Sequence, residues 1–219
     1  MITYEMLKEN ADIRTYIRKA DESLASLGFT EHSFAHVTKV AETAGYLLTE
    51  LGYDNHEVEL VKIAGFLHDI GNLVNRIDHS QSGAVMAFRL LDHMDMTPED
   101  IATVVSAIGN HDEGTGVPVH AVAAALILAD KSDVRRSRVR NTDIASFDIH
   151  DRVNYSVQSS LLKINTDHTK VKLKLDIDTH YSPVMEYFEI FMDRMILCRK
   201  AAARLGLEFK LIINEQPLL

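Results

Sequence analysis

Two polar residues, His68 and Asp69, close an apolar stretch that begins at Ile63. The residues between Ile63 and His68, Ala-Gly-Phe-Leu, favour a buried helix. Packing alone does not explain why two good metal ligands stand side by side at the end of such a helix. The chain must fold so that this doublet meets partners, and we therefore interpret it as the centre of a metal site.

Length and composition place the chain among ordinary globular proteins. Its 219 residues suffice for one large core, or for a core with a small appended lobe. Hydrophobic residues make up 46% and charged residues 25%, which is typical of this class. The N-terminus turns polar within Met1–Glu5, unlike a signal peptide, and no apolar run approaches the roughly 20 residues that span a bilayer. We expect a cytoplasmic protein without a membrane partner.

Charge and cysteine content restrict the ligands. The formal net charge of -9 disfavours a nucleic-acid polymer, which needs a broad basic face, but permits a small phosphorylated substrate. The single cysteine, Cys198, lies in a helical pattern and is expected to be buried. With eleven histidines and one cysteine, a metal site here would use imidazole and carboxylate, which suit Mn, Fe, Co, Ni or Zn without choosing among them.

Apolar residues recur with a helical period through the first two thirds of the chain. Glycines, an N-capping threonine and a proline in a first turn mark the ends of the segments. The expected helices cover residues 3–27 (one helix, or two broken near Asn10), 31–51, 55–70, 79–91, 97–110 and 119–133.

The period changes beyond about residue 150. Alternating residues on either side of Asn165-Thr166-Asp167, from Tyr155 to Leu161 and from Val171 to Ile177, predict a β-hairpin. A helix at 183–205 and a strand at 207–213 follow. The predicted fold class is mainly α, a helical bundle with a small C-terminal α+β lobe made of a β-hairpin, a long helix and a strand. We divide the chain into an N-terminal helical segment (1–30), the helical domain (31–150) and the C-terminal lobe (151–219).

Candidate ligands occur near one end of each helix in this domain, as expected when facing helices project side chains inward to bind metal. They are His36, His68, Asp69, His79, His111 and Asp130. Asp130 is the most informative, because it ends the apolar run Val122–Ala129, where an unpaired carboxylate would cost several kcal/mol. His32 is expected to be exposed or to cap a helix. The remaining histidines are expected at the surface: His56, His93, His120, His150, His168 and His180.

The ordered series of ligands resembles the HD-domain superfamily of metal-dependent phosphohydrolases, which is helical and named for its His-Asp doublet. The resemblance covers roughly residues 30–135. It includes His68-Asp69-Ile70-Gly71, His79 followed by Gly83-Ala84, and Ala129-Asp130-Lys131.

The resemblance implies a site with two divalent ions. His36, His68, Asp69 and Asp130 would hold one ion, and Asp69 would bridge to a second completed by His79 and His111. Asp69, His79 and His111 would thus be catalytic, because a metal-activated hydroxide attacks phosphorus in line. The expected enzyme is a phosphohydrolase cleaving a small, nucleotide-like phosphomonoester or phosphodiester.

Four residues are candidates for contacts with the substrate. Lys131 adjoins the last ligand, and Arg135 and Arg136 follow it closely. Asn72 stands where many relatives carry a lysine, which removes one cation from the phosphate side. The segment 110–118 partly resembles the branch that opens cyclic dinucleotides, but Asn110 and Val117 replace its histidine and tyrosine.

Two other functions fit the same ligand series. One is a di-iron HD-type oxygenase, since some relatives use these six ligands to activate oxygen. The other is a non-catalytic sensor that binds metal and nucleotide and signals through the C-terminal lobe. The alternating strands of that lobe leave an edge that could pair with a second copy, which predicts a homodimer.

Overall fold

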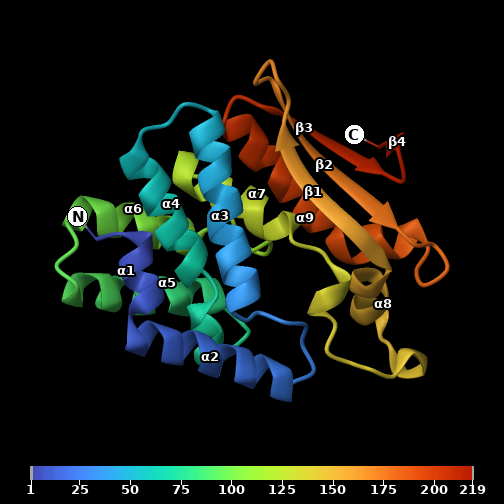
Figure 1. The fold of residues 1–219 in the computed structure, drawn as a ribbon, viewed down its shortest axis with the longest axis horizontal. Coiled ribbons are helices and arrows are strands. Elements are labelled where there is room, and N and C mark those ends of the chain that lie inside the picture. The colour runs from blue at the N-terminus through green and yellow to red at the C-terminus, as the bar shows by residue number, and fades with distance from the viewer. Residues whose placement is uncertain (1, 219) are drawn as a thin grey trace.

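The computed structural model describes residues 2–218 and begins with two helices, the second of which runs along the bottom of a helical bundle in Figure 1. These are α1 (Tyr4–Glu9) and α2 (Ala11–Ser26). The side chain of Asn10 accepts hydrogen bonds from the backbone N–H groups of Asp12 and Ile13 and so caps α2. The break predicted near Asn10 is therefore confirmed.

The bundle itself consists of helices whose starts follow from N-capping side chains, among them Ser33, Asp54 and Thr97. They are α3 (Phe34–Glu50), α4 (Asn55–Leu67), the short 3₁₀ helix η1 (Ile70–Leu73), α5 (His79–His93), α6 (Pro98–Gly109) and α7 (Ala121–Ser132). Helix α7 is buried from Val122 onward and packs against α3, α4, α6 and α9. It forms the centre of the fold.

The C-terminal lobe follows two short 3₁₀ helices, η2 (Arg136–Arg138) and η3 (Ile144–Ser146). Its elements are α8 (Ile149–Ser156), β1 (Val157–Ile164), β2 (Lys170–Ile177), α9 (Val184–Arg204), β3 (Glu208–Ile213) and β4 (Gln216–Pro217). The sheet order is β1-β2-β3-β4. Strands β1 and β2 form the predicted antiparallel hairpin, whereas β2 and β3 are parallel because α9 connects them.

Helix α9 joins the lobe to the bundle. One side of it packs against α7, and the other covers β2 and β3 (Figure 1). The alternating residues Val171, Leu173, Leu175 and Ile177 are buried, as the period-two pattern predicts, and Cys198 is buried within α9. The mainly α fold with a small α+β lobe is confirmed. The division at residues 30 and 150 stays a prediction.

Helix α8 differs from the sequence-based expectation, which placed Tyr155 in a strand. Asp148 caps the helix by accepting a hydrogen bond from the backbone N–H of Asp151, so the chain stays helical to Ser156. The alternating pattern that forms β1 begins only at Val157. This extra helix faces the bundle across a cavity described below.

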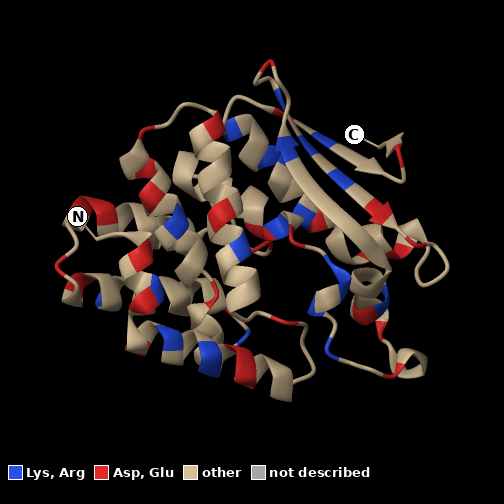
Figure 2. Ribbon diagram, viewed as in Figure 1, with Lys and Arg blue, Asp and Glu red and all other residues tan. Residues whose placement is uncertain are grey.

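Acidic and basic residues are interspersed over the helices (Figure 2). The segment 135–140, which contains four arginines, runs between α7 and α8. Within residues 2–218, the helices are too short or too polar to cross a membrane.

Candidate metal centre

Six side chains from five parts of the bundle meet in one buried space. His36 lies in the first turn of α3, His68 and Asp69 follow the end of α4, and His79 begins α5. His111 comes directly after α6, and Asp130 lies in the last turn of α7. All six are at most 8% exposed. The structure thus brings together every residue that the sequence singled out as a candidate ligand.

Asp69 lies between two groups of imidazoles. Its Oδ2 is 3.4 Å from Nε2 of His36 and 3.2 Å from Nε2 of His68, whereas its Oδ1 is 3.4 Å from Nε2 of His79. Nε2 of His79 is in turn 3.2 Å from Nε2 of His111. The two carboxylate oxygens of Asp69 therefore face different groups of nitrogen donors, as a bridging ligand requires.

Asp130 joins the first of these groups. Its Oδ1 is 3.4 Å from Nε2 of His36 and 3.6 Å from Nε2 of His68. Two sets of three residues each bring their donor atoms within 4.8 Å of one another. One set is His36, His68 and Asp130, and the other is His68, Asp69 and His111. His68 thus lies at the junction of the two sets.

The hydrogen bonds of the imidazoles fix which nitrogen faces the centre. Each Nδ1 lies next to an acceptor oxygen, so the proton of the neutral ring belongs on Nδ1 and the lone pair on Nε2. The Nδ1 distances are 2.7 Å to Asp133 Oδ2 for His36, 2.8 Å to the Gly65 carbonyl for His68, 3.1 Å to the Arg76 carbonyl for His79 and 2.6 Å to the Ile108 carbonyl for His111.

Lone pairs that face one another at this separation repel unless a cation lies between them. Nε2 of His36 and Nε2 of His68 are 3.3 Å apart, and Oδ2 of Asp69 is buried without a hydrogen-bond partner among residues 2–218. An unpaired buried carboxylate oxygen is costly. The four imidazoles and two carboxylates therefore fit divalent transition-metal ions.

The electrostatics of the cluster keep both carboxylates ionised, which is the state in which they bind metal. Burial opposes ionisation of Asp69 and Asp130, but the histidines around both and the ammonium of Lys131 beside Asp130 hold the pKa of each carboxyl well below its usual range. Burial lowers the pKa of His111, and the cations nearby lower it further. Burial alone would lower the pKa of His68 too, but Asp69 and Asp130 raise it to about 10. The carboxylates thus attract positive charge into the cluster.

Asp133 supports the cluster from outside, and sequence reasoning missed it. Its Oδ2 accepts the Nδ1–H of His36, and its Oδ1 is 3.0 Å from both Lys39 Nζ and Arg135 Nε. Such outer carboxylates orient a ligating imidazole and raise its basicity. The available signal was its position one helical turn after Asp130.

Close backbone contacts at Gly71 position the His68-Asp69 doublet next to the start of α5. A Cβ on Gly71 would lie 2.0 Å from the carbonyl oxygen of His79 and 2.4 Å from the backbone nitrogen of Gly83. Only glycine allows η1 and the start of α5 to approach this closely. The Gly71 and Gly83 positions therefore bring His79 next to Asp69.

Two of the predicted substrate contacts lie at the cluster. Lys131 is 4% exposed, and its Nζ is 2.8 Å from Asp130 Oδ2 and 2.9 Å from Glu113 Oε2. Asn72 donates from Nδ2 to the carbonyl oxygen and Oδ1 of Asp69, at 2.9 and 3.0 Å, and accepts a hydrogen bond from Arg76. Asn72 thus holds Asp69 and Arg76 in place.

The other two predicted contacts lie farther out. Arg135 pairs with Glu31 and Asp133, and Arg136 stacks on Tyr155 with its guanidinium carbon 4.3 Å from the ring centroid. The cavity beside the cluster is lined instead by other arginines, namely Arg76, Arg138 and Arg194. His32 also lines this cavity. His150 lies at its outer end.

Comparison with known proteins agrees with this geometry. The HD domain family matches residues 33–153, and the chain belongs to this family, within the HD superfamily of metal-dependent phosphohydrolases. Ribonuclease Y 1 of Pediococcus pentosaceus is 31% identical over 115 residues, which are 51% of this chain and 20% of that protein. An uncharacterized protein of Methanocaldococcus jannaschii is 26% identical over 164 residues, 63% of this chain and 61% of that protein.

A solved structure is also similar. It is the crystal structure of a predicted HD superfamily hydrolase from an uncultured Thermotogales bacterium, with 27% identity and a TM-score of 0.44. The match covers 57% of this chain and 67% of that chain. The chain spans less than two thirds of either curated relative named above.

Replacing Asp69 by Ala should remove bound metal while leaving the helical fold intact, because this residue is the one carboxylate between both groups of imidazoles. Elemental analysis of the purified variant would measure the metal, and circular dichroism the helices. Asp92→Ala, at an exposed position of α5, is the control. Full metal content in Asp69→Ala would contradict the bridging role.

The variant Asp133→Asn should weaken metal affinity about 10- to 100-fold, as is usual when an outer partner of a ligating histidine is lost. The substitution keeps the size of the side chain but removes the charge next to His36 Nδ1. Titration against a chelator of known affinity would measure the change. Unaltered affinity would show that Asp133 serves only the ion pairs with Lys39 and Arg135.

Proposed function

We propose that the protein is a metal-dependent phosphohydrolase that cleaves a small, nucleotide-like phosphomonoester or phosphodiester. One observation carries the proposal: four imidazole Nε2 atoms and two carboxylates converge in a buried space where Asp69 Oδ2 lacks a partner among residues 2–218. Membership of the HD family supports the reaction class.

In this proposal the six residues hold two divalent ions. His36, His68, Asp69 and Asp130 hold one, and Asp69, His79 and His111 hold the other. The native metal is Mn, Fe, Co, Ni or Zn, all of which accept nitrogen and oxygen ligands. Such ions supply a hydroxide nucleophile at neutral pH and neutralise charge on phosphoryl oxygens.

The chain supplies the remaining contacts. Lys131 and Arg76 adjoin the cluster, with Arg76 Nη1 3.4 Å from His79 Nε2, and are placed to bind phosphoryl oxygens. Asn72 holds the carboxylate of Asp69 so that Oδ2 stays free. Arg135 and Arg136 stay candidates for contacts with a phosphate of the substrate.

Small substrates suit this chain better than a nucleic-acid polymer. Ribonuclease Y is the name of a relative, of which this chain matches 20%. The net charge of -9 and the interspersed charges in Figure 2 oppose binding of a long polyanion. We further infer a cytoplasmic protein and a homodimer in which the open edge of β1 pairs with a second copy.

The di-iron oxygenase remains the alternative enzyme, because it would use the same ligands. The cations that line the site favour phosphate instead. Anaerobic iron reconstitution distinguishes the two: oxygen uptake with a mixed-valent spectroscopic signal would favour the oxygenase. Lack of turnover across a broad panel of phosphate esters would favour the sensor.

Removal of metal should abolish hydrolysis and lower the thermal midpoint, because the buried donors then lose their cation. A ligand present at 100 times its dissociation constant stabilises a fold by about 2.7 kcal/mol. Dialysis against a chelator, followed by stepwise return of each candidate metal, would measure both effects. Activity that persists after the metal content has fallen to zero would contradict the proposal.

Replacing Arg76 by Ala should lower kcat/KM for a phosphomonoester about 10- to 100-fold, since a hydrogen bond to a charged group contributes about 1.5–3 kcal/mol. Metal content should be unchanged. Parallel measurements on Arg135→Ala and Arg136→Ala test whether either contacts substrate: a raised KM would support a contact, and unaltered kinetics would refute it.

A further inference from the structure

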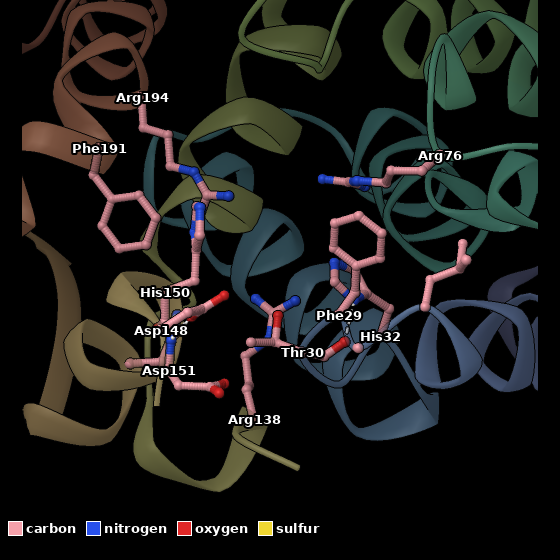
Figure 3. A pocket seen from close by; sticks show the side chains of 13 residues that line it. Phe29, Thr30, His32, Arg76, Arg138, Asp148, His150, Asp151, Phe191 and Arg194 are labelled. Atoms are coloured by element: carbon pink, nitrogen blue, oxygen red, sulfur yellow. Dashed lines mark hydrogen bonds between the residues drawn. The ribbon is translucent and has the colours of Figure 1, made fainter. Parts of the chain in front are cut away.

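A recess leads from the metal centre to the surface between the bundle and the C-terminal lobe. Its inner hollow is bordered by Asp69, His79, Asp130 and Lys131. Its outer cavity has a volume of about 200 Å³. Figure 3 shows Phe29 and Arg76 on one side of this cavity and Phe191 and Arg194 on the other. His32, Arg76, Arg138 and Arg194 line both spaces, so the outer cavity adjoins the inner hollow, which has a volume of about 10 Å³.

The inner end is rich in cations. Arg76 contacts His79 and Asn72 and has no carboxylate within 4 Å among residues 2–218. Lys131 and Arg194 both pair with the carboxylate of Glu113, and Lys131 also pairs with Asp130. An anionic group of the substrate is therefore favoured here.

Arg138 adds a buried cation. It is 5% exposed, and its Nε and Nη1 donate to the carbonyl oxygens of Glu31 and Asp133, at 2.9 and 2.8 Å. The nearest carboxylate oxygen, on Asp133, is 3.8 Å away and is shared with His36. Neutral carbonyl partners leave most of this charge uncompensated. In Figure 3 the guanidinium lies between the two walls of the cavity.

The outer end has the opposite charge. Asp148 and Asp151, at the start of α8, border the cavity. Asp148 accepts the backbone N–H of Asp151, and Asp151 accepts from the side chain of Asn141, but neither has a cation within 4 Å among residues 2–218. Carboxylates accept hydrogen bonds and repel anions. Hydrogen-bond donors are favoured here, and a second phosphate is disfavoured.

Two phenylalanines provide apolar surface between these ends. Phe29, which is 40% exposed, lies beneath Arg76, and Phe191 of α9 lies beneath Arg194 on the opposite side (Figure 3). Apolar walls with a few polar groups are typical of pockets for small molecules. A volume near 200 Å³ is smaller than the roughly 300–1,000 Å³ of drug-sized sites, which favours a leaving group no larger than a nucleoside.

We propose that the recess selects phosphomonoesters whose leaving group carries hydrogen-bond donors and no further phosphate, such as a nucleoside. The phosphate binds at the inner cations, and Asp148 and Asp151 bind donors and exclude bisphosphates. Hydrolysis joins the oxygen of one water to phosphorus and breaks the ester P–O bond. One proton of that water passes to the leaving oxygen, giving an alcohol and inorganic phosphate. This proposal rests on the hydrolysis proposed above.

The test compares adenosine 5′-monophosphate with adenosine 3′,5′-bisphosphate on the metal-loaded protein. We expect kcat/KM at least about tenfold higher for the monophosphate, from charge repulsion at the outer end. The double variant Asp148→Asn/Asp151→Asn should reduce this preference about tenfold, mainly by lowering KM for the bisphosphate. Asparagine keeps the cap of α8.

The control variant Asp92→Asn/Asp193→Asn removes the same charge at exposed positions outside the recess and should keep the preference. Equal hydrolysis of both compounds by the wild-type protein, or a preference that survives in Asp148→Asn/Asp151→Asn, would overturn the proposal.

Absence of turnover with every ester would refute the proposed hydrolysis, but it would not refute the proposed selectivity of the recess. The dissociation constants of the same two compounds, measured by calorimetry, then decide. A preference for the monophosphate that falls in the Asp148→Asn/Asp151→Asn variant would support the recess, and equal affinities would overturn it.

Discussion

The structure depends on the mutual approach of imidazole lone pairs and a carboxylate oxygen in a buried space. Hydrogen bonds at Nδ1 direct Nε2 of His36, His68, His79 and His111 inward, where they can be satisfied only by a cation or a proton. The helices around the cluster hold these groups together against their repulsion. The tight contact at Gly71 and the burial of α7 are parts of that framework.

Charge is organised in layers around this cluster. The ligands are surrounded by residues that orient them, with Asp133 behind His36 and Asn72 behind Asp69. Cations follow on the side of the recess, and carboxylates lie at its mouth. A net charge of -9 therefore coexists with a locally positive interior, because the acidic residues are mostly elsewhere. In the function that we propose, this arrangement separates the tasks of holding metal, binding phosphate and choosing a leaving group.

Sequence reasoning predicted which residues converge in the cluster, and most helices and strands, because each carries a local signal. Asp130 ends a long apolar run and His68-Asp69 closes another, so burial of a polar group was evident without a structure. The residues of the recess lack such a signal: Arg76, Arg138 and Arg194 look like ordinary surface arginines until the loops and α9 bring them together. Helix α8 was missed because its cap at Asp148 outweighs a strand-like residue at Tyr155. A buried polar residue can be predicted from its sequence neighbours, whereas the meeting of side chains from distant segments cannot.

Helix α9 lies outside the region that matches the HD family, yet it reaches the recess with Phe191 and Arg194. Its opposite face packs against strands β2 and β3, which support the helix from the side away from the recess. In the proposed function, metal binding thus depends on the bundle, whereas the choice of leaving group depends in part on α9. A lineage could exchange residues on α9 and acquire a new substrate while the metal ligands stay untouched, so that relatives with the same six ligands need not share a substrate.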